Sequence, residues 1–400
     1  MRVLIDYRPA LRERTGVGEY TLELVKALAG TIAPGALDLT IFSSSFRDRL
    51  RLDDHLPGVH AVDRRVPVRL LNLAWHRLGW PTAEALAGRA FDVTHSPHPL
   101  LLPSRTAAQV ITIHDLSFLH RVDQTRRDVR HHYPDLVHAH ARRADRIIVS
   151  SEYAAGEVVR LLDVQPGKIA LCPPGAPAWP ARTAAPSSGY ILFVGTLEPR
   201  KNVGALLDAY ERLLSRPAKA GRYDNMESGR GGRTKDGRAS ADAGRAWPEL
   251  VLAGKATASS RSWLERIARP PLQGVVRHLG YFDAAHRRAL YEGARMLVLP
   301  SLDEGFGLPV LEAMTVGVPV IAANRGALPE VVGAAGLLIN PDNPEELAAA
   351  IERLLADEGF AAACTAKGLA RAREFRWDAT ARRVYDVYQQ AIEHRRCASV

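Results

Sequence analysis

Short apolar runs alternate with longer amphipathic stretches along most of this 400-residue chain. The runs are rich in Val, Ile and Leu, which favours buried strands, and the stretches between them repeat apolar residues at helical spacing. This alternation is typical of strand-helix-strand units, so it predicts α/β domains built on parallel sheets. We expect strands at residues 3–5, 37–42, 91–94, 110–113 and 147–149, and again at 190–194, 250–253, 275–279, 296–299, 318–322 and 337–339.

The length of the chain and one proline-rich stretch predict two doubly wound domains. A chain of 400 residues exceeds one ordinary hydrophobic core and fits two domains of roughly 150–200 residues each. Between residues 173 and 188 prolines interrupt any periodic pattern, so this stretch is expected to be a linker. We place an N-terminal domain at residues 1–180, a C-terminal domain at residues 181–375 and a closing helical segment at residues 376–400.

The net charge of +9 is unevenly distributed along the sequence. Residues 216–246 contain eight Lys and Arg against four Asp and Glu, six glycines and almost no bulky aliphatic residue. Such a segment cannot bury enough apolar surface to order itself, so we expect a disordered insertion. RNA-binding tails have a similar composition, but only Tyr223 could stack on a base. A solvated loop is therefore the favoured interpretation, and no nucleic-acid partner is expected.

Several absences indicate a cytoplasmic protein. No stretch approaches the 18 or so apolar residues that a membrane-spanning helix needs. The first expected strand begins directly after Met1 and Arg2, which leaves no room for a signal peptide. The three cysteines, at positions 172, 364 and 397, lack the paired spacing of a disulfide framework or a zinc site.

The richest candidate site, PSLDEGFGLPVLE at residues 300–312, follows the strand expected at residues 296–299. Ligands of doubly wound sheets bind beyond the carboxyl ends of the strands. Gly305 and Gly307 allow the backbone to approach a ligand, and the helix that follows offers its N-terminal amides to a diphosphate. Glu312 lies one turn into that helix, where its carboxylate could accept hydrogen bonds from ribose hydroxyls. The same pattern is also typical of a glycine turn before a helix with an early glutamate.

A second candidate is the segment GTLEPRKN at residues 195–202, which follows the strand expected at residues 190–194. Arg200 and Lys201 lie just before the next helix. A diphosphate leaving group needs cationic stabilisation as its charge develops, and an Arg-Lys pair supplies it without a metal. A solvated pair of cations in a turn is the alternative.

The N-terminal half offers weaker candidates. Gly16 and Gly18 precede a helix after the first strand, but the pattern also fits a tight turn and lacks the third glycine of the dinucleotide fingerprint. His114 and Asp115 follow the strand expected at residues 110–113, where they could contact a substrate or simply fix a loop. Ser151 begins a helix, so an N-cap role explains it without any function.

The Glu-x7-Glu pattern in EGFGLPVLEA, the GVPV that follows it and the GTLEPRKN segment together resemble the retaining glycosyltransferases of the GT4 family. The resemblance covers nearly the whole chain. It implies the GT-B fold, in which two Rossmann-like doubly wound α/β domains face a central cleft and the last helix crosses back to the N-terminal domain. It implies these catalytic residues: His114, Glu304, Arg200 and Lys201. It implies donor contacts from Gly16, Gly18, Gly195, Arg200, Lys201, Glu304, Phe306, Gly307, Leu308 and Glu312, with Asp115 and Ser151 as candidate acceptor or sugar contacts.

The resemblance also implies a reaction. A hexose is transferred from a nucleotide-diphosphate sugar with retention of configuration, and the leaving phosphate helps to take the acceptor proton. Residues 3–20 and 113–118 look most like mannosyltransferases of surface-polysaccharide assembly. We therefore expect GDP-mannose as donor, ahead of UDP-sugars, and a saccharide or polyprenyl-linked saccharide as acceptor. No metal or other cofactor is expected, because no Asp-x-Asp pair follows a strand.

Other functions remain open at this point. A nucleotide-sugar epimerase of similar fold would use the same nucleotide loops, whereas a noncatalytic nucleotide-sugar binding module would not need both Glu304 and Glu312. A phosphorylase would need a lysine context for pyridoxal phosphate, which we do not find. The stretch from Arg121 to Arg146 contains seven arginines and four aspartates. This excess of basic residues fits either a peripheral contact with an anionic membrane or a solvated helix with internal ion pairs.

Overall fold

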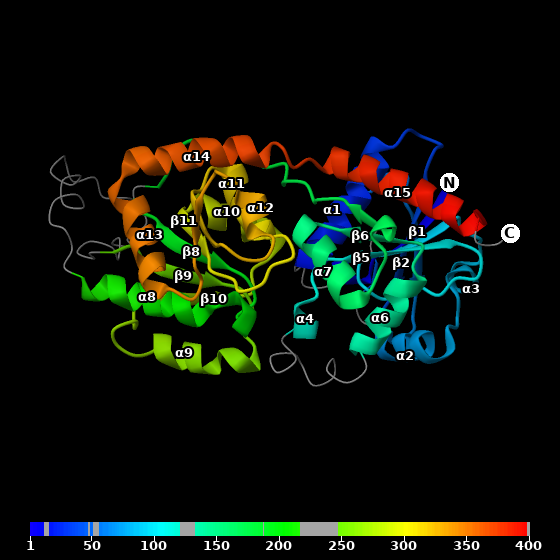
Figure 1. Cartoon of the computed structure of the whole chain (residues 1–400), viewed down its shortest axis with the longest axis horizontal. Coiled ribbons are helices and arrows are strands. Elements are labelled where there is room, and N and C mark those ends of the chain that lie inside the picture. Colours follow the sequence, from blue (N-terminus) through cyan, green and yellow to red (C-terminus); the bar gives the residue numbers. More distant parts are fainter. Residues whose placement is uncertain are drawn as a thin grey trace. The chain divides into compact units, whose positions relative to one another are not determined.

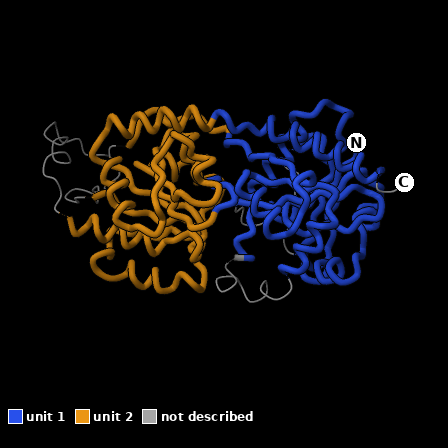
Figure 2. Tube along the Cα trace, in the orientation of Figure 1, with its two compact units in different colours: residues 1–177, 304–308, 373–400 blue, residues 178–303, 309–372 orange. Residues whose placement is uncertain are grey.

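The computed structural model describes residues 1–11, 16–46, 49–50, 56–120, 133–186, 188–216 and 247–397. The chain divides into two compact units (Figure 2). Unit 1 comprises Met1–Pro177, Glu304–Leu308 and Arg373–Val400, and unit 2 comprises Ala178–Asp303 and Pro309–Ala372. Unit 1 thus includes a five-residue segment whose sequence neighbours on both sides belong to unit 2.

Among the described residues, unit 1 contains a seven-stranded sheet in the order β3-β2-β1-β4-β5-β6-β7, and all neighbouring strands are parallel (Figure 1). This order, which reverses between β1 and β4, is that of a doubly wound Rossmann-like fold. The strands are β1 Arg2–Asp6, β2 Asp38–Ser44, β3 His60–Arg64, β4 Val93–Ser96, β5 Ala108–Ile113, β6 Arg146–Val149 and β7 Ile169–Leu171.

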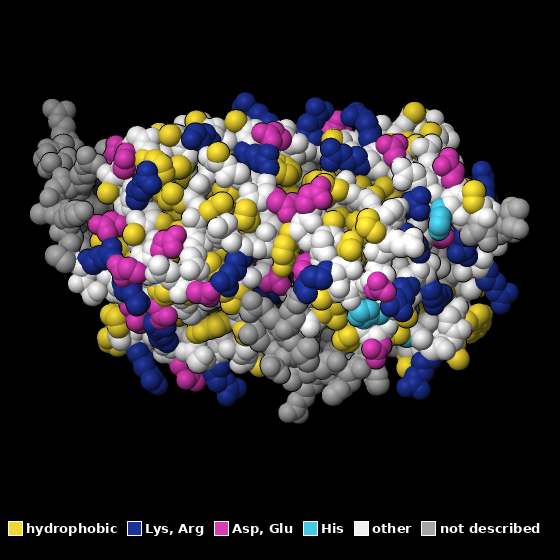
Figure 3. Space-filling view, in the orientation of Figure 1, with side chains coloured by type: hydrophobic (Ala, Val, Ile, Leu, Met, Phe, Trp, Pro, Cys, Tyr) yellow, Lys and Arg dark blue, Asp and Glu magenta, His cyan; other side chains and the backbone are white. Residues whose placement is uncertain are grey.

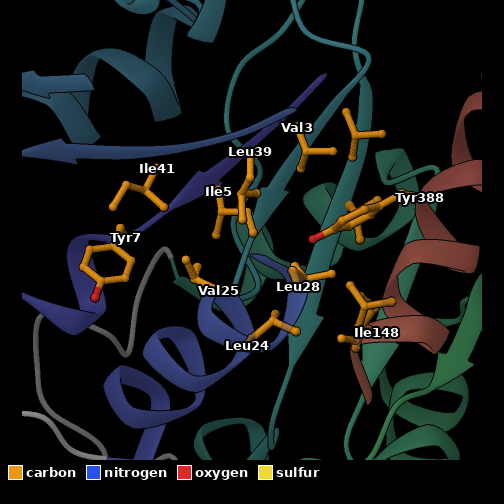
Figure 4. Close-up of a cluster of buried hydrophobic side chains, with 14 of the residues drawn as sticks. Val3, Ile5, Tyr7, Leu24, Val25, Leu28, Leu39, Ile41, Ile148 and Tyr388 are labelled. Carbon is orange, nitrogen blue, oxygen red and sulfur yellow. The ribbon is translucent and has the colours of Figure 1, made fainter. Parts of the chain in front are cut away.

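Helices cover both faces of the unit 1 sheet because side chains alternate between the faces along each strand. Val3 and Ile5 of β1 pack into one buried cluster with α1 and α15 (Figure 4), whereas Leu4 packs into another with Trp75 of α2. The helices of this unit are α1 Gly16–Thr31, α2 Val68–Leu78, α3 Ala83–Ala87, α4 Ser117–His120, α6 Tyr133–Arg143, α7 Glu152–Leu162 and α15 Trp377–Cys397.

The C-terminal helix α15 is an integral part of the unit 1 core. Val384, Val387 and Tyr388 are buried in the same cluster as β1 and α1. The Tyr388 hydroxyl lies 2.7 Å from Nδ1 of His95, whose Nε2 lies 2.8 Å from the Thr112 hydroxyl. Both ring nitrogens of His95 are therefore used within the core, and burial lowers the pKa of this histidine to about 3.

Among the described residues, unit 2 contains a six-stranded parallel sheet in the order β10-β9-β8-β11-β12-β13, which reverses between β8 and β11. The strands are β8 Tyr190–Val194, β9 Leu250–Ala253, β10 Val276–Gly280, β11 Ala294–Leu299, β12 Val320–Ala323 and β13 Leu337–Ile339. The helices are α8 Val203–Ser215, α9 Arg261–Ile267, α10 Ala284–Glu292, α11 Leu308–Val316, α12 Leu328–Val332, α13 Pro344–Ala356 and α14 Glu358–Ala372.

The prediction of two Rossmann-like doubly wound units is confirmed, and each expected strand is present to within a few residues at its ends. Strands β3 and β7 were missed. Both lie at the edges of the unit 1 sheet. Strand β3 is partly exposed and contains charged residues, and the apolar run of β7 is only three residues long.

The prediction of a disordered insertion needs one correction. Arg216 directly follows α8 and forms ion pairs with Glu345 and Glu352, the latter at 2.6 Å. The rest of that insertion, residues 217–246, lies outside the described residues. In the described part of the chain, no helix combines the length and the apolar composition needed to cross a bilayer.

Candidate functional site

The two segments that the sequence singles out in the C-terminal half meet at one edge of the unit 2 sheet. Residues 195–202 follow β8 and residues 300–303 follow β11, and these neighbouring strands flank the point where the strand order reverses. Ligands of doubly wound sheets bind at such a point, beyond the carboxyl ends of the strands. Gly195 continues directly from β8, and its amide donates to the Ala253 carbonyl at 2.9 Å.

Arg200 holds these two loops together. Its backbone carbonyl accepts a hydrogen bond from the Leu302 amide at 2.7 Å, and its guanidinium donates to the Asp303 carbonyl at 3.1 Å. The Nε atom donates to the carboxylate of Glu198 at 2.7 Å. Arg200 therefore has a structural role that the sequence did not reveal, in addition to the predicted phosphate contact.

Lys201 is buried in the short turn that precedes α8. Its stem runs beside Gly195, where an added Cβ would lie 3.5 Å from the Lys201 Cε atom. A buried ammonium at the carboxyl edge of a sheet is a favourable counterion for a phosphate group. The structure thus places both members of the predicted Arg-Lys pair at the expected edge of the sheet, one half-buried and one buried.

Glu312 lies one turn into α11, as the sequence predicts, but it is buried and already bonded to α10. Arg287 approaches both carboxylate oxygens, with contacts of 2.6 and 3.1 Å. The Tyr291 hydroxyl donates to Oε2 at 2.6 Å. Burial and the neighbouring Glu312 carboxylate raise the pKa of Tyr291 well above its ordinary value, so this hydroxyl remains a donor.

This three-residue network was not predicted from the sequence. Arg287 and Tyr291 lie one turn apart on α10, Glu312 lies on α11, and no sequence motif joins the two helices. The network fixes the orientation of Glu312, and a carboxylate oxygen can accept more than one hydrogen bond. A contact between Glu312 and a ribose is therefore compatible with the observed geometry. The expectation that the Glu312 carboxylate is free of other partners is wrong.

In unit 1, His114 follows β5, and its side chain is half-buried with the Nε2 atom shielded from solvent. Burial lowers the pKa of His114 to about 4, so the ring is neutral near pH 7. A hydrogen bond links the ring to the Pro97 backbone, whereas Nε2 has no hydrogen-bond partner among the described residues. The Pro97 bond must then use Nδ1, which leaves Nε2 as an acceptor for a hydroxyl donor. The Tyr20 ring packs edge-on against the imidazole with centroids 4.6 Å apart.

The segment Glu304–Leu308 packs beside His114 within unit 1. A Cβ added to Gly305 would lie 1.7 Å from the His114 carbonyl oxygen, so this position requires glycine. The Gly305 carbonyl accepts hydrogen bonds from the hydroxyls of Ser150 and Ser151, at 3.0 and 2.7 Å. Glu304 itself is buried. The structure thus brings His114, Glu304 and Ser151 into one region, together with Ser150, which the sequence analysis passed over.

The rest of this segment, Phe306 to Leu308, leads into helix α11. Phe306 packs edge-on against Phe375 with centroids 5.7 Å apart. Gly307 has a φ of 102°, which favours glycine, and Leu308 is the first residue of α11. The segment is therefore held by specific packing in unit 1 up to the helix N-terminus that was predicted to face a diphosphate.

Two predicted contacts have local structural partners. The Ser151 hydroxyl accepts from the Ala154 amide at 3.0 Å, which confirms the N-cap interpretation. The carboxylate of Asp115 accepts from the amide and the hydroxyl of Ser117 at the start of α4. Gly16 and Gly18 lie in the first turn of α1, where only Gly18 packs closely, against the Pro9 carbonyl.

A polar cluster at the carboxyl end of β1 was not predicted from the sequence. Asp6 is fully buried, and its carboxylate accepts hydrogen bonds from the Arg8 guanidinium, from Nε to Oδ1 at 2.8 Å and from Nη2 to Oδ2 at 2.6 Å. His98 Nε2 lies 3.1 Å from Oδ2, the carboxylate oxygen that also accepts from Arg8 Nη2. Burial alone would raise the pKa of Asp6, but the Arg8 charge and these hydrogen bonds hold it well below its ordinary value. The rule of searching directly after each strand would have found Asp6.

No group of three or more His, Cys, Asp or Glu that could hold a metal ion is present in the described ranges. Metal independence is a statement about the reaction and stays a prediction.

Comparisons with known proteins match both halves of the chain. Residues 14–178 match Glycosyltransferase Family 4, and residues 239–357 match Glycosyl transferases group 1. Over 412 aligned residues the chain is 32% identical to O-antigen chain mannosyltransferase B of Escherichia coli, covering 97% of this chain and 100% of that protein.

Two solved structures share the fold at low sequence identity. Sucrose-phosphate synthase from Thermosynechococcus elongatus aligns with a TM-score of 0.73 at 21% identity, covering 97% of this chain and 98% of that one. Anabaena HepE in complex with UDP and glucose aligns with a TM-score of 0.65 at 16% identity, covering 96% and 98%.

Proposed function

Because this chain belongs to the GT4 family of GT-B glycosyltransferases, and is therefore a glycosyltransferase, we propose that it transfers mannose from GDP-mannose to a saccharide or a polyprenyl-linked saccharide. The observation that carries the choice of mannose is the end-to-end similarity to the O-antigen chain mannosyltransferase. The same similarity supports a place in surface-polysaccharide synthesis. A UDP-sugar is the second candidate donor, because HepE, which shares the fold, was solved with UDP and glucose.

In this proposal the unit 2 groups bind the nucleotide part of the donor. Arg200, Lys201 and the first amides of α11 compensate the charge that develops on the diphosphate. Glu312, oriented by Arg287 and Tyr291, accepts hydrogen bonds from the ribose. The fixed orientation supports this role, since a bound hydroxyl then meets a group that needs no rearrangement.

The unit 1 groups act on the sugar. Nε2 of His114 accepts a hydrogen bond from a sugar hydroxyl, and Glu304 contacts the same sugar from the segment that packs beside His114. The bond between the anomeric carbon and the diphosphate oxygen breaks, and a bond from that carbon to the acceptor oxygen forms on the same face. The acceptor proton passes to the leaving diphosphate, so no protein nucleophile and no metal are required.

A lipid-linked acceptor adds a peripheral contact with an anionic membrane at its cytoplasmic face. Of the arginine-rich stretch that suggested this contact, Arg121, Arg126, Arg127 and Arg130 lie outside the described residues. Arg142 is described and pairs with Asp163 at 3.4 Å on the surface.

The proposal is tested by donor turnover. The purified protein is incubated with GDP-mannose, UDP-glucose or UDP-N-acetylglucosamine, each with and without a mannose-terminated acceptor, and released nucleotide and products are measured. We expect acceptor-dependent GDP release and a new α-linked mannose. Conversion of the nucleotide sugar into an epimer without acceptor would instead show an epimerase, and acceptor-dependent UDP release would change the donor.

A further inference from the structure

Exposed apolar side chains gather on one element of unit 1, the helix α2 together with Trp80 just beyond it. The most exposed of them are Leu78 at 74%, Leu70 at 61%, Trp80 at 60% and Leu73 at 53%. Val68 belongs to the same group, and the other exposed large apolar residues in the described part of the chain are scattered over different elements. A concentration of exposed apolar surface of this kind marks a site of interaction.

Helix α2 is firmly anchored by its opposite face. Leu71 and Trp75, one turn apart, are buried in a cluster with Leu4 and Phe42 of the sheet. The Trp75 indole donates to the Pro81 carbonyl at 2.8 Å. Because Leu70 and Leu73 are three residues apart, they share the outer face of the helix. These leucines are thus exposed on the outer face of a helix whose inner face is packed against the sheet.

The charged residues within this segment of the sequence have a single sign. From Arg64 to Ala83 the sequence contains four arginines and no Asp or Glu. Arg64 is bonded to the Leu86 carbonyl, whereas Arg69 and Arg77 are exposed on α2. Leucines and a tryptophan flanked by exposed arginines are typical of helices that lie in the interface of an anionic membrane.

The same charge pattern disfavours a second copy of this chain as the partner. In a symmetric dimer the same surface patch meets itself, so Arg69 and Arg77 would face their own copies without an acidic residue of α2 between them. Anionic lipid headgroups complement these arginines, and the acyl boundary accepts the leucines and the indole.

We infer that the outer face of α2, formed by Leu70, Leu73, Leu78, Trp80 and the two exposed arginines, docks unit 1 on an anionic lipid bilayer. Figure 1 labels α2 in unit 1, and Figure 3 shows basic and apolar side chains next to one another over that lower part of the unit. The helix would lie parallel to the membrane, with its leucines below the level of the headgroups.

The inner face of the same helix connects this surface to the polar cluster at the end of β1. The Arg8 guanidinium donates to the Asn72 side chain at 2.8 Å and lies 4.6 Å from the Trp75 ring centroid. Docking through α2 therefore brings the carboxyl edge of the unit 1 sheet close to the lipid surface. This last consequence rests on the proposed function, because it matters only if the acceptor is lipid-linked.

The docking is tested by cosedimentation of the full chain with vesicles, without donor or acceptor. We expect binding to phosphatidylcholine vesicles that contain phosphatidylglycerol, weaker binding to pure phosphatidylcholine, and a blue shift of tryptophan fluorescence that is lost in Trp80→Phe. Leu70→Gln/Leu73→Gln should weaken binding by about 100-fold, because two leucines no longer leave water. Arg69→Gln/Arg77→Gln should weaken it by about 30-fold and remove most of its salt dependence.

Matched controls separate a specific surface from general basicity. Val159→Gln/Leu279→Gln removes exposed apolar residues elsewhere, and Arg261→Gln/Arg269→Gln removes exposed arginines of unit 2; both should bind like the parent. No vesicle binding at low salt, equal loss in the controls, or a dimer that Leu70→Gln/Leu73→Gln dissociates would overturn the inference. Donor turnover on a water-soluble acceptor should be unchanged in the α2 variants, so failure of the docking is distinguishable from failure of the transferase proposal.

Discussion

The two units share a strand order, yet they hold their polar groups at the carboxyl edge in different ways. In unit 2, Glu312 is enclosed by Arg287 and Tyr291, and Arg200 is bonded to both loops of the edge. In unit 1, the Nε2 atom of His114 is shielded from solvent and has no hydrogen-bond partner among the described residues. Glu312 and Arg200 of unit 2 are thus held by hydrogen bonds within the protein, whereas His114 of unit 1 retains an open acceptor nitrogen.

This difference separates residues that shape a site from an atom that is available to a ligand. A closed network fixes charges before a substrate arrives, which is how electrostatic stabilisation becomes effective. A buried polar atom without a partner costs free energy unless something satisfies it. Substitutions in each unit test whether these groups act in the two ways described.

The largest effect is expected from Arg200→Ala/Lys201→Ala. Each charge-assisted contact to the leaving diphosphate contributes about 2–4 kcal/mol at the transition state, so kcat should fall by about 10³-fold or more. Steady-state kinetics check this, with Arg261→Ala as a surface control in the same unit. Because Arg200 also bonds the two loops, Lys201→Gln separates charge from structure: it should lose turnover with little change in thermal unfolding. Activity that disappears with EDTA and returns with manganese would contradict this picture.

The closed network predicts a different balance between stability and activity. Glu312→Gln leaves the Arg287 charge without its partner and should destabilise unit 2 by about 3–5 kcal/mol while raising the donor KM. Tyr291→Phe removes one hydrogen bond to a charged group and should cost about 1.5–3 kcal/mol, with kcat nearly unchanged. Thermal unfolding of both variants measures the loss of stability, and steady-state kinetics measure the change in the donor KM and in kcat. A Glu312→Gln enzyme with parental KM would remove Glu312 from the ribose site.

The open acceptor predicts that His114→Ala lowers kcat/KM by about 10²-fold, equivalent to about 2.7 kcal/mol of lost transition-state stabilisation. Since burial lowers the pKa of His114 to about 4, kcat/KM should show no ionisation of this residue near pH 6.5. A limb near pH 6.5 that vanishes in His114→Asn would contradict the buried, neutral ring.

The same pKa has a consequence for stability. The unfolded chain binds a proton at this histidine below its ordinary pKa of about 6.5, whereas the folded chain does so only near pH 4. The contribution of His114 to the free energy of unfolding therefore decreases as the pH falls from 6.5 toward 4. Denaturant unfolding at several pH values should show a shallower dependence in His114→Asn than in the parent.

The smallest effects are expected at the start of α1. A Cβ at Gly18 would lie 2.5 Å from the Pro9 carbonyl oxygen, so Gly18→Ala should destabilise unit 1 by about 1–3 kcal/mol. Nothing lies within 4 Å of a Cβ at Gly16, so Gly16→Ala should be neutral or stabilise by up to about 1 kcal/mol. A Gly16→Ala variant that is stable but slow would support the predicted donor contact, and full activity would argue against it.

The sequence predicted the sheets because strands buried on both faces, such as β9 with all four residues buried, are unmistakable apolar runs. It also predicted which loops carry polar groups, because Arg200 and Glu304 directly follow β8 and β11. The networks within the site were beyond such reasoning. Glu312 and Arg287 lie on different helices, and Gly305 contacts His114 across nearly half of the chain, so only tertiary packing brings them together.

Binding of nucleoside diphosphates tests the central claim most directly, because it requires no knowledge of the acceptor. Thermal unfolding is measured with GDP, UDP and ADP for the parent and for Arg200→Ala/Lys201→Ala. We predict that GDP stabilises the parent most, by about 2.7 kcal/mol at 100 times its dissociation constant, and that the double variant loses this gain. Stabilisation by none of the three nucleotides, or equal stabilisation of parent and variant by GDP, would contradict the account.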